Sequence, residues 1–168
     1  TMNMTDTTPT ESNLSGLDRK DFQKNINSRK TDLYILKNAQ GMEVAVTNYG
    51  CAILSIMVPD KNGKFANVIL GHDSIEHVIN SPEPFLSTTI GRYGNRIANG
   101  KFTLYGEEHQ LTVNNGPNSL HGGPTGFHAR VWDAVQPNES TVIFNYTSAD
   151  GEEGFPGTLE IEMTYRLE

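Results

Sequence analysis

The polar side chains best suited to bind a small molecule lie in one glycine-rich stretch, residues 88–123. Asn95 and Arg96 follow a glycine, and His121 precedes two more. Glycine lets the backbone adopt positive φ or pass close to another molecule, and polar side chains between such glycines lie on loops of the kind that carry binding chemistry. We therefore expect a ligand to meet these three side chains, together with further polar groups of the same stretch: Arg92, Tyr93 and Asn118.

The residue types favour a hydroxyl-rich ligand but leave a structural alternative open. The guanidinium of Arg96 is a planar fork of donors and the amide of Asn95 both donates and accepts, which suits adjacent sugar hydroxyls and a ring oxygen. Alternatively, Arg96 pairs with a carboxylate and Asn95 holds a turn. His121 offers an imidazole with an ordinary pKa of about 6.5, able to bind a hydroxyl or donate a proton. It could equally satisfy loop carbonyls.

A hairpin within the same stretch is the element that would bring these groups together. Lys101–Tyr105 and His109–Val113 have strand patterns on either side of Gly106. A hairpin here would place Asn95 and Arg96 at the same end of a sheet as His121.

The rest of the chain predicts an all-β fold built from an antiparallel sandwich. Short alternating or apolar runs are separated by turn residues, such as Asn62-Gly63, and one short helix is expected over Ser74–Asn80, capped by Asp73 or Ser74. The predicted strands are Asp32–Asn38, Met42–Asn48, Ala52–Val58, Phe65–Leu70, His128–Val135, Thr141–Thr147 and Gly157–Leu167.

The last predicted strand, Gly157–Leu167, alternates apolar and polar residues over its whole length. Such a strand buries one face and needs an opposing sheet, and its edge needs a partner. We expect the sandwich to be incomplete in this chain, with the neighbours of Glu168 supplied by further polypeptide.

We predict that residues 1–27 form a leader segment and that residues 28–168 form the N-terminal part of one β-sandwich domain. Thr1–Leu17 is rich in Thr, Ser and Asn and has little to bury, so we expect it to be disordered or peripheral and to add little stability. Asp18–Asn27 is predicted to form a short helix that docks through Phe22 and Ile26.

Composition excludes several classes of function. The formal net charge of −7 disfavours nucleic acid as a partner, and no apolar stretch is long enough for a membrane span. Cys51 is the single cysteine, and His72 and His77 are five residues apart, off the spacing that places two ligands on one helix face. We expect no metal site; Phe127 and Trp132 are aromatic candidates for sugar stacking, with core packing preferred for Trp132.

Four segments together resemble the aldose 1-epimerase (galactose mutarotase) family. They are NYGCAILSIMVPDKNGKFANVILGHDS, GRYGNRIANGKF, NNGPNSLHGGPTGFHARVWDA and SADGEEGFPGTLEIEMTYRL, and the resemblance covers roughly residues 32–168. It implies a large galactose mutarotase-like sandwich that binds a hexose and interconverts its anomers by acid–base ring opening. It also implies that Asn95, Arg96 and His121 bind the sugar, His121 as a supporting, substrate-orienting residue of the catalytic site.

The same resemblance implies an isomerase of hexose metabolism that needs no cofactor. The principal acid histidine and base glutamate of the family are expected outside these 168 residues, so the missing C-terminal part is an expected partner besides the hexose. Neither nucleic acid nor membrane is expected as a partner. A cytoplasmic location is implied, or an exported one if a signal preceded Thr1. A non-catalytic carbohydrate-binding module and a hexose-phosphate epimerase are the alternatives.

Overall fold

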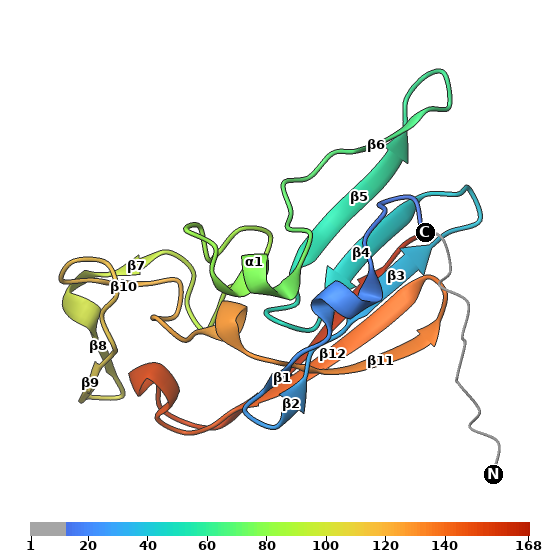
Figure 1. The fold of residues 1–168 in the computed structure, drawn as a ribbon. Coiled ribbons are helices and arrows are strands. Elements are labelled where there is room, and N and C mark those ends of the chain that lie inside the picture. Colours follow the sequence, from blue (N-terminus) through green and yellow to red (C-terminus); the bar gives the residue numbers. More distant parts are fainter. Residues whose placement is uncertain (1–12) are drawn as a thin grey trace, which may run out of the picture.

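The computed structural model describes residues 13–168 and consists of two antiparallel sheets with three small two-stranded ribbons (Figure 1). The first sheet has the order β3-β4-β5-β6 and the second the order β11-β12-β13. The all-β antiparallel prediction is confirmed. The bounds of these strands are β3 Leu33–Lys37, β4 Glu43–Thr47, β5 Ile53–Pro59, β6 Phe65–Asn67, β11 Asp133–Asn138, β12 Thr141–Ser148 and β13 Leu159–Arg166.

The ribbons and helices are short and lie around the two sheets. The ribbons pair β1 with β2, β7 with β10, and β8 with β9. The bounds are β1 Asn25–Ile26, β2 Arg29–Lys30, β7 Arg96–Ile97, β8 Lys101–Leu104, β9 Glu107–Gln110 and β10 Ser119–Leu120. The single α-helix of the described residues is α1 (Ile75–Ile79), and the 3-10 helices are η1 Arg19–Phe22, η2 Ala98–Gly100, η3 Phe127–Ala129 and η4 Glu152–Gly154.

The main core lies between the two sheets. Val46 of the first sheet packs in one cluster with Val142 and Phe144 of β12, and Trp132 closes the cluster beside Phe127. All five are buried. This arrangement is a sandwich, since the apolar residues of each sheet remove the other from water.

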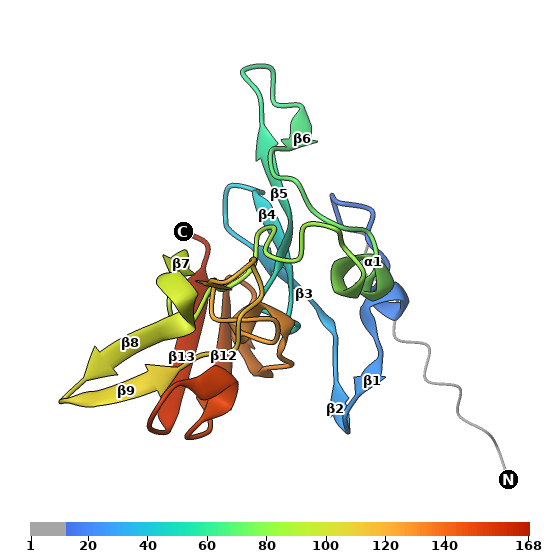
Figure 2. The same cartoon turned by 90° about the vertical axis from the view of Figure 1, so that its left-hand side faces the viewer.

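A second core covers the opposite face of the first sheet. Phe22 of η1 and Ile75 and Val78 of α1 pack on Ala45 and Leu54. Figure 2 shows η1 and α1 on the far side of the first sheet from β12 and β13. The central strand β4 is therefore buried on both faces.

Glu43 of β4 is buried because the N-terminal segment supplies donors for its carboxylate. The side chain is 1% exposed, and its two oxygens accept hydrogen bonds from the backbone N–H groups of Leu14 and Ser15, at 2.8 and 3.1 Å. A buried carboxylate is tolerated only when it is bonded in this way. These contacts of residues 14 and 15 were not predicted from the sequence. Residues 1–12 of the predicted leader lie outside the described residues.

The strand predicted over His128–Val135 is wrong in its first five residues, and only Asp133–Val135 lie in a strand. Phe127–Ala129 forms η3, and β11 begins only at Asp133. Trp132 donates from Nε1 to the carbonyl of Phe127 at 3.2 Å, which folds this segment back on itself. The apolar residues here mark a packed corner between loop and sheet, for which local alternation gives no signal.

The end of the chain lies at the second sheet and contacts residues of two hairpin turns. Leu167 donates its N–H to the carbonyl of Ser140 at 2.8 Å, and Asn38 Nδ2 donates to the carbonyl of Glu168 at 2.8 Å. β13 pairs with β12 along its full length, and its other edge forms no ladder with a described strand.

Within residues 13–168, no helix is long and apolar enough to cross a membrane, and no three His, Cys, Asp or Glu side chains converge as metal ligands.

Candidate functional site

The two loops predicted to bind a ligand are joined directly by a two-residue antiparallel ladder. In the β7–β10 ladder Arg96 pairs with Leu120. The backbone of Asn95 and His121 continues this pairing, since the His121 N–H donates to the carbonyl of Asn95 at 3.1 Å. The structure thus brings Asn95, Arg96 and His121 together, through their own ladder and not at the ends of the β8–β9 hairpin.

A second contact fixes the ring of His121. The backbone N–H of Asn95 donates to His121 Nδ1 at 2.9 Å. Since Nδ1 accepts this bond, a neutral His121 carries its proton on Nε2. Nε2 forms no hydrogen bond within residues 13–168, so its N–H group has donor capacity left.

Arg96 is held by two asparagines that leave part of its fork free. Its Nε donates to Asn115 Oδ1 at 2.8 Å, and its Nη1 donates to Asn95 Oδ1 at 3.3 Å. No carboxylate among the described residues forms an ion pair with Arg96. The alternative that Arg96 serves to pair with a carboxylate is therefore not supported. Nη2 has no hydrogen-bond partner within the described residues, and Arg96 is exposed. The outward-facing groups are therefore donors.

The backbone conformation behind this cluster requires particular residue types. Asn95 and His121 have φ of 69° and 51°, in the left-handed region that asparagine and histidine tolerate better than most residues. Gly122 has φ of 88°, and a Cβ there would lie 1.8 Å from the carbonyl oxygen of Gly91. Only glycine fits this position, so the loop that carries His121 is seated tightly on the loop that precedes Asn95.

Arg92, expected from the sequence to face a ligand, has a structural role instead. Its guanidinium donates to Ser148 Oγ at 3.0 and 3.1 Å and to four backbone carbonyls at 2.7 to 3.2 Å. These carbonyls belong to Ser148, Ala149, Pro156 and Gly157. Arg92 thus ties the β12–β13 connection to the site loop and has little capacity left for a ligand.

The other sequence candidates divide between loop support, core and surface. Asn118 accepts from the N–H of Asn99 at 3.2 Å, so it shapes its loop. Phe127 and Trp132 are buried in the main core, which leaves neither free to stack on a sugar. Tyr93, two residues before Asn95, is exposed and remains a candidate for stacking on a sugar.

Phe85 and His128, which were not predicted as site residues, form the layer beneath His121. The ring of Phe85 lies 4.8 Å from that of His121 and 4.4 Å from that of His128, centre to centre. His128 is buried, and burial, followed by the nearby positive groups of His121 and Arg130, lowers the pKa of His128 to about 4. Neither contact was predicted from the sequence. His128 was assigned only to the start of a strand, and Phe85 lies before the glycine-rich stretch that was searched for site residues.

A carboxylate lies against the other side of the His121 loop. A Cβ at Gly123 would lie 2.5 Å from Glu153 Oε2. This oxygen is buried and has no hydrogen-bond partner among the described residues. The adjacent Glu152 is engaged: it accepts from Tyr146 Oη at 2.5 Å and Ser148 Oγ at 2.9 Å. Together with burial, the Glu152 contact raises the pKa of Tyr146 to about 12.

Comparison with known proteins shows that the chain is similar to aldose 1-epimerases. Residues 32–168 match the family described as Aldose 1-epimerase. The chain is 41% identical over 127 residues to a galactose mutarotase of Bos taurus, which covers 76% of this chain and 36% of that protein. It is 42% identical over 135 residues to an aldose 1-epimerase of Escherichia coli K12, which covers 80% of this chain and 39% of that protein.

Solved structures of epimerases also superpose on this chain. A GalM/aldose epimerase homologue from C. elegans superposes with a TM-score of 0.77 at 32% identity, over 82% of this chain and 42% of that one. A galactose 1-epimerase from Lactobacillus acidophilus NCFM superposes with a TM-score of 0.75 at 30% identity, over 86% and 42%. The chain spans 36% to 39% of the length of the two curated relatives described above.

Proposed function

Because the chain belongs to the aldose 1-epimerase family, we propose that it is the sugar-binding part of a mutarotase. The reaction is the interconversion of the α and β anomers of hexoses such as galactose and glucose. The observation that carries the proposal is the mutual anchoring of Asn95, Arg96 and His121, which leaves donors on Arg96 and His121 facing outward. All three residues lie in the part of the chain that matches the family.

The proposed chemistry is a pair of proton transfers with no cofactor. A base removes the proton from the anomeric hydroxyl while an acid protonates the ring oxygen, and the bond between C1 and that oxygen breaks. The resulting aldehyde rotates about the C1–C2 bond and closes on its other face. Each acid or base group of this kind typically contributes about 10²–10⁴-fold in rate.

In this scheme Arg96 and His121 orient the sugar. The Nε2–H of His121 and the free N–H groups of Arg96 are donors only, which matches the lone pairs of a ring oxygen and hydroxyls. Since donors fixed in advance stabilise charge that develops on an oxygen, the two groups lower the barrier near the ring oxygen. Asn95 holds both of them and presents its own Nδ2 group.

We further propose that the principal acid and base lie outside these 168 residues. Two features support this. The chain spans little more than a third of its curated relatives. His121 Nδ1 accepts from the N–H of Asn95, so His121 is not placed to act as the base.

The two alternatives from the sequence analysis have less support. A hexose-phosphate epimerase needs additional basic groups, but Arg92 is committed to backbone carbonyls. A binding module without catalysis shares the site but not the activity, so an activity measurement separates it from a mutarotase.

Polarimetry of freshly dissolved α-D-galactose tests the proposal in the intact protein. We expect Arg96→Ala and His121→Ala each to lower kcat/KM by at least about tenfold, which corresponds to about 1.4 kcal/mol of transition-state stabilisation. The matched controls are Lys61→Ala, an exposed cation of the β5–β6 turn, and His109→Ala on β9. Both controls should retain the wild-type rate.

Wild-type rates in both site variants would remove Arg96 and His121 from the site. Sugar binding without any acceleration of mutarotation by the unmodified protein would favour the binding module instead.

A further inference from the structure

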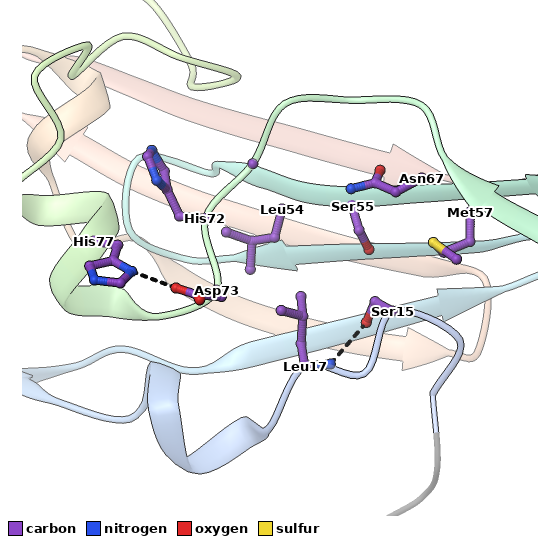
Figure 3. Close-up of a pocket in the computed structure, with 10 residues that line it drawn as sticks. Ser15, Leu17, Leu54, Ser55, Met57, Asn67, His72, Asp73 and His77 are labelled. Atoms are coloured by element: carbon purple, nitrogen blue, oxygen red, sulfur yellow. Dashed lines mark hydrogen bonds and ion pairs between the residues drawn. The ribbon is translucent and has the colours of Figure 1, made fainter.

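A hollow of about 340 Å³ lies on the face of the first sheet that η1 and α1 cover. Its floor is formed by Leu54, Ser55 and Met57 of β5, and one wall is formed by Ser15 and Leu17 of the N-terminal segment. The connection from β6 to α1 forms the opposite wall (Figure 3). None of the lining residues belongs to the cluster around His121.

The hydroxyl of Ser55 is the feature that points to a ligand. Ser55 is 2% exposed, and its Oγ has no hydrogen-bond partner within residues 13–168. Figure 3 shows this side chain projecting from β5 toward the segment that carries Ser15 and Leu17. A buried hydroxyl without a partner costs about 1–3 kcal/mol, so a group that bonds it inside the hollow would recover that cost.

Other polar groups of the hollow have bonding capacity left. Asn67 accepts with Oδ1 from the N–H groups of Ile56 and Ile69, at 3.0 and 3.2 Å, which leaves its Nδ2 as a double donor. Asp73 accepts from His77 Nδ1 with one carboxylate oxygen, at 2.5 Å, which leaves the second oxygen as an acceptor. The wall therefore offers both donors and acceptors.

The lining disfavours charged ligands, since its basic side chains are two histidines and one of them, His77, is paired with Asp73. It contains no lysine or arginine, which disfavours phosphates and carboxylates. Its one carboxylate, Asp73, is already paired with His77, which disfavours a cationic ligand. The described residues contain no group of three metal-ligating side chains.

What remains is a neutral compound whose groups both donate and accept. We propose that this hollow is a binding site for a small polyhydroxylated molecule, a sugar alcohol or monosaccharide, separate from the site around His121. The ligand's hydroxyls bond Ser55 Oγ and Asn67 Nδ2, and its C–H face lies on Leu54 and Met57. The volume lies at the small end of the range for ligand pockets, about 300–1,000 Å³, which suits a compound of this size.

The methyl group of Met57 provides a direct probe of the hollow. In the intact protein labelled with ¹³C-methyl methionine, titration with D-sorbitol should shift the Met57 resonance in a saturable manner. Met163, which packs between the two sheets, serves as the internal reference and should not shift. The Met57 signal is assigned with Met57→Leu.

Two variants remove single bonding groups while preserving the fold. Ser55→Ala removes the unpartnered hydroxyl, and Asn67→Asp keeps the Oδ1 bonds to Ile56 and Ile69 but removes the Nδ2 donors. Each should raise the dissociation constant for sorbitol at least about fivefold, the loss expected for one hydrogen bond. Arg96→Ala should leave the Met57 titration unchanged, because Arg96 does not line the hollow.

The proposal is overturned if Met57 shows no saturable shift with sorbitol. It is also overturned if both variants bind as tightly as the wild type, or if Arg96→Ala abolishes the shift. Failure of mutarotation in the polarimetric assay would leave these outcomes unaffected, so the two proposals can fail separately.

Discussion

At the scale of single residues, the candidate site is a set of donors held in place by backbone and amide groups. The N–H of Asn95 fixes the His121 ring, and the Oδ1 atoms of Asn95 and Asn115 hold two nitrogens of Arg96. Because these supports are short and local, little rotamer freedom remains to be lost when a ligand binds. The polarimetric test of Arg96 and His121 belongs to this scale.

The second prediction at the residue scale concerns how stability depends on pH through His128. Burial, followed by the neighbouring His121 and Arg130, lowers the pKa of His128 to about 4, against about 6.5 in an unfolded chain. Between these values the unfolded state binds the proton and the folded state does not. Stability is therefore fully present above pH 6.5 and is lost as the pH falls toward 4.

NMR titration of the His128 ring in the intact protein measures this directly, and the midpoint should lie below pH 5. Replacement by His128→Phe should flatten the dependence of unfolding free energy on pH between 4 and 6.5. A His128 midpoint near 6.5 would contradict the packing described for Phe85 and His128.

At the scale of elements, local patterns predicted the strands that alternate cleanly. Leu159–Arg166 was recognised because Ile161, Met163 and Tyr165 alternate with charged and polar residues, and these side chains do pack toward the main core. The helix Ile75–Ile79 was recognised from its cap, and Ser74 Oγ indeed accepts from the N–H of His77 at 3.2 Å.

Local patterns failed where distant segments decide burial. The burial of Glu43 was not predictable from local sequence, because its donors lie 28 and 29 residues earlier in the chain. The strand assigned to His128–Val135 failed for a related reason: Phe127 and Trp132 are apolar because they close a core corner, not because they alternate along a strand.

The prediction at the scale of elements concerns the contribution of Arg92 to stability. Its guanidinium joins the loop before Asn95 to the connection between β12 and β13. Lysine has one ammonium group and cannot reach Ser148 and both ends of this connection together. We expect Arg92→Lys to lower the free energy of unfolding by about 3 kcal/mol, measured by urea denaturation of the intact protein.

The matched control is Arg166→Lys, because Arg166 is an exposed residue of β13. The connection that Arg92 holds, residues 149–158, should also become the preferred site of limited proteolysis in Arg92→Lys. Equal stability and equal proteolysis of the two variants would show that the carbonyl bonds of Arg92 contribute little.

At the scale of the whole molecule, the juxtaposition of the site residues was predictable and its geometry was not. Asn95, Arg96 and His121 were selected from the sequence as one site, and the structure places them together. The β7–β10 ladder that joins them has only two residues per strand, too short for any periodicity to reveal. Phe85, which packs against His121, was missed because contact between aromatic rings depends on the fold and not on spacing.

The apolar surface of β13 gives a prediction for the chain as a whole. Leu159 is 41% exposed, and Ile161, Met163, Tyr165 and Leu167 are half-buried, on a strand with one edge unpaired in the described part of the chain. Exposed edges of this kind pair with other chains. We expect the 168-residue chain on its own to self-associate in light scattering, and Leu159→Lys to reduce the association. A monodisperse wild-type chain that melts cooperatively would contradict this.

The central claim is that a hexose binds at the β7–β10 ladder, and a crystal structure of the intact protein with D-galactose tests it most directly. We expect a pyranose with oxygens within about 3 Å of His121 Nε2 and of the Arg96 guanidinium, the distance of a hydrogen bond. The ring oxygen or the anomeric hydroxyl should be one of those oxygens. A galactose bound elsewhere, with His121 and Arg96 contacting only protein, would contradict the account.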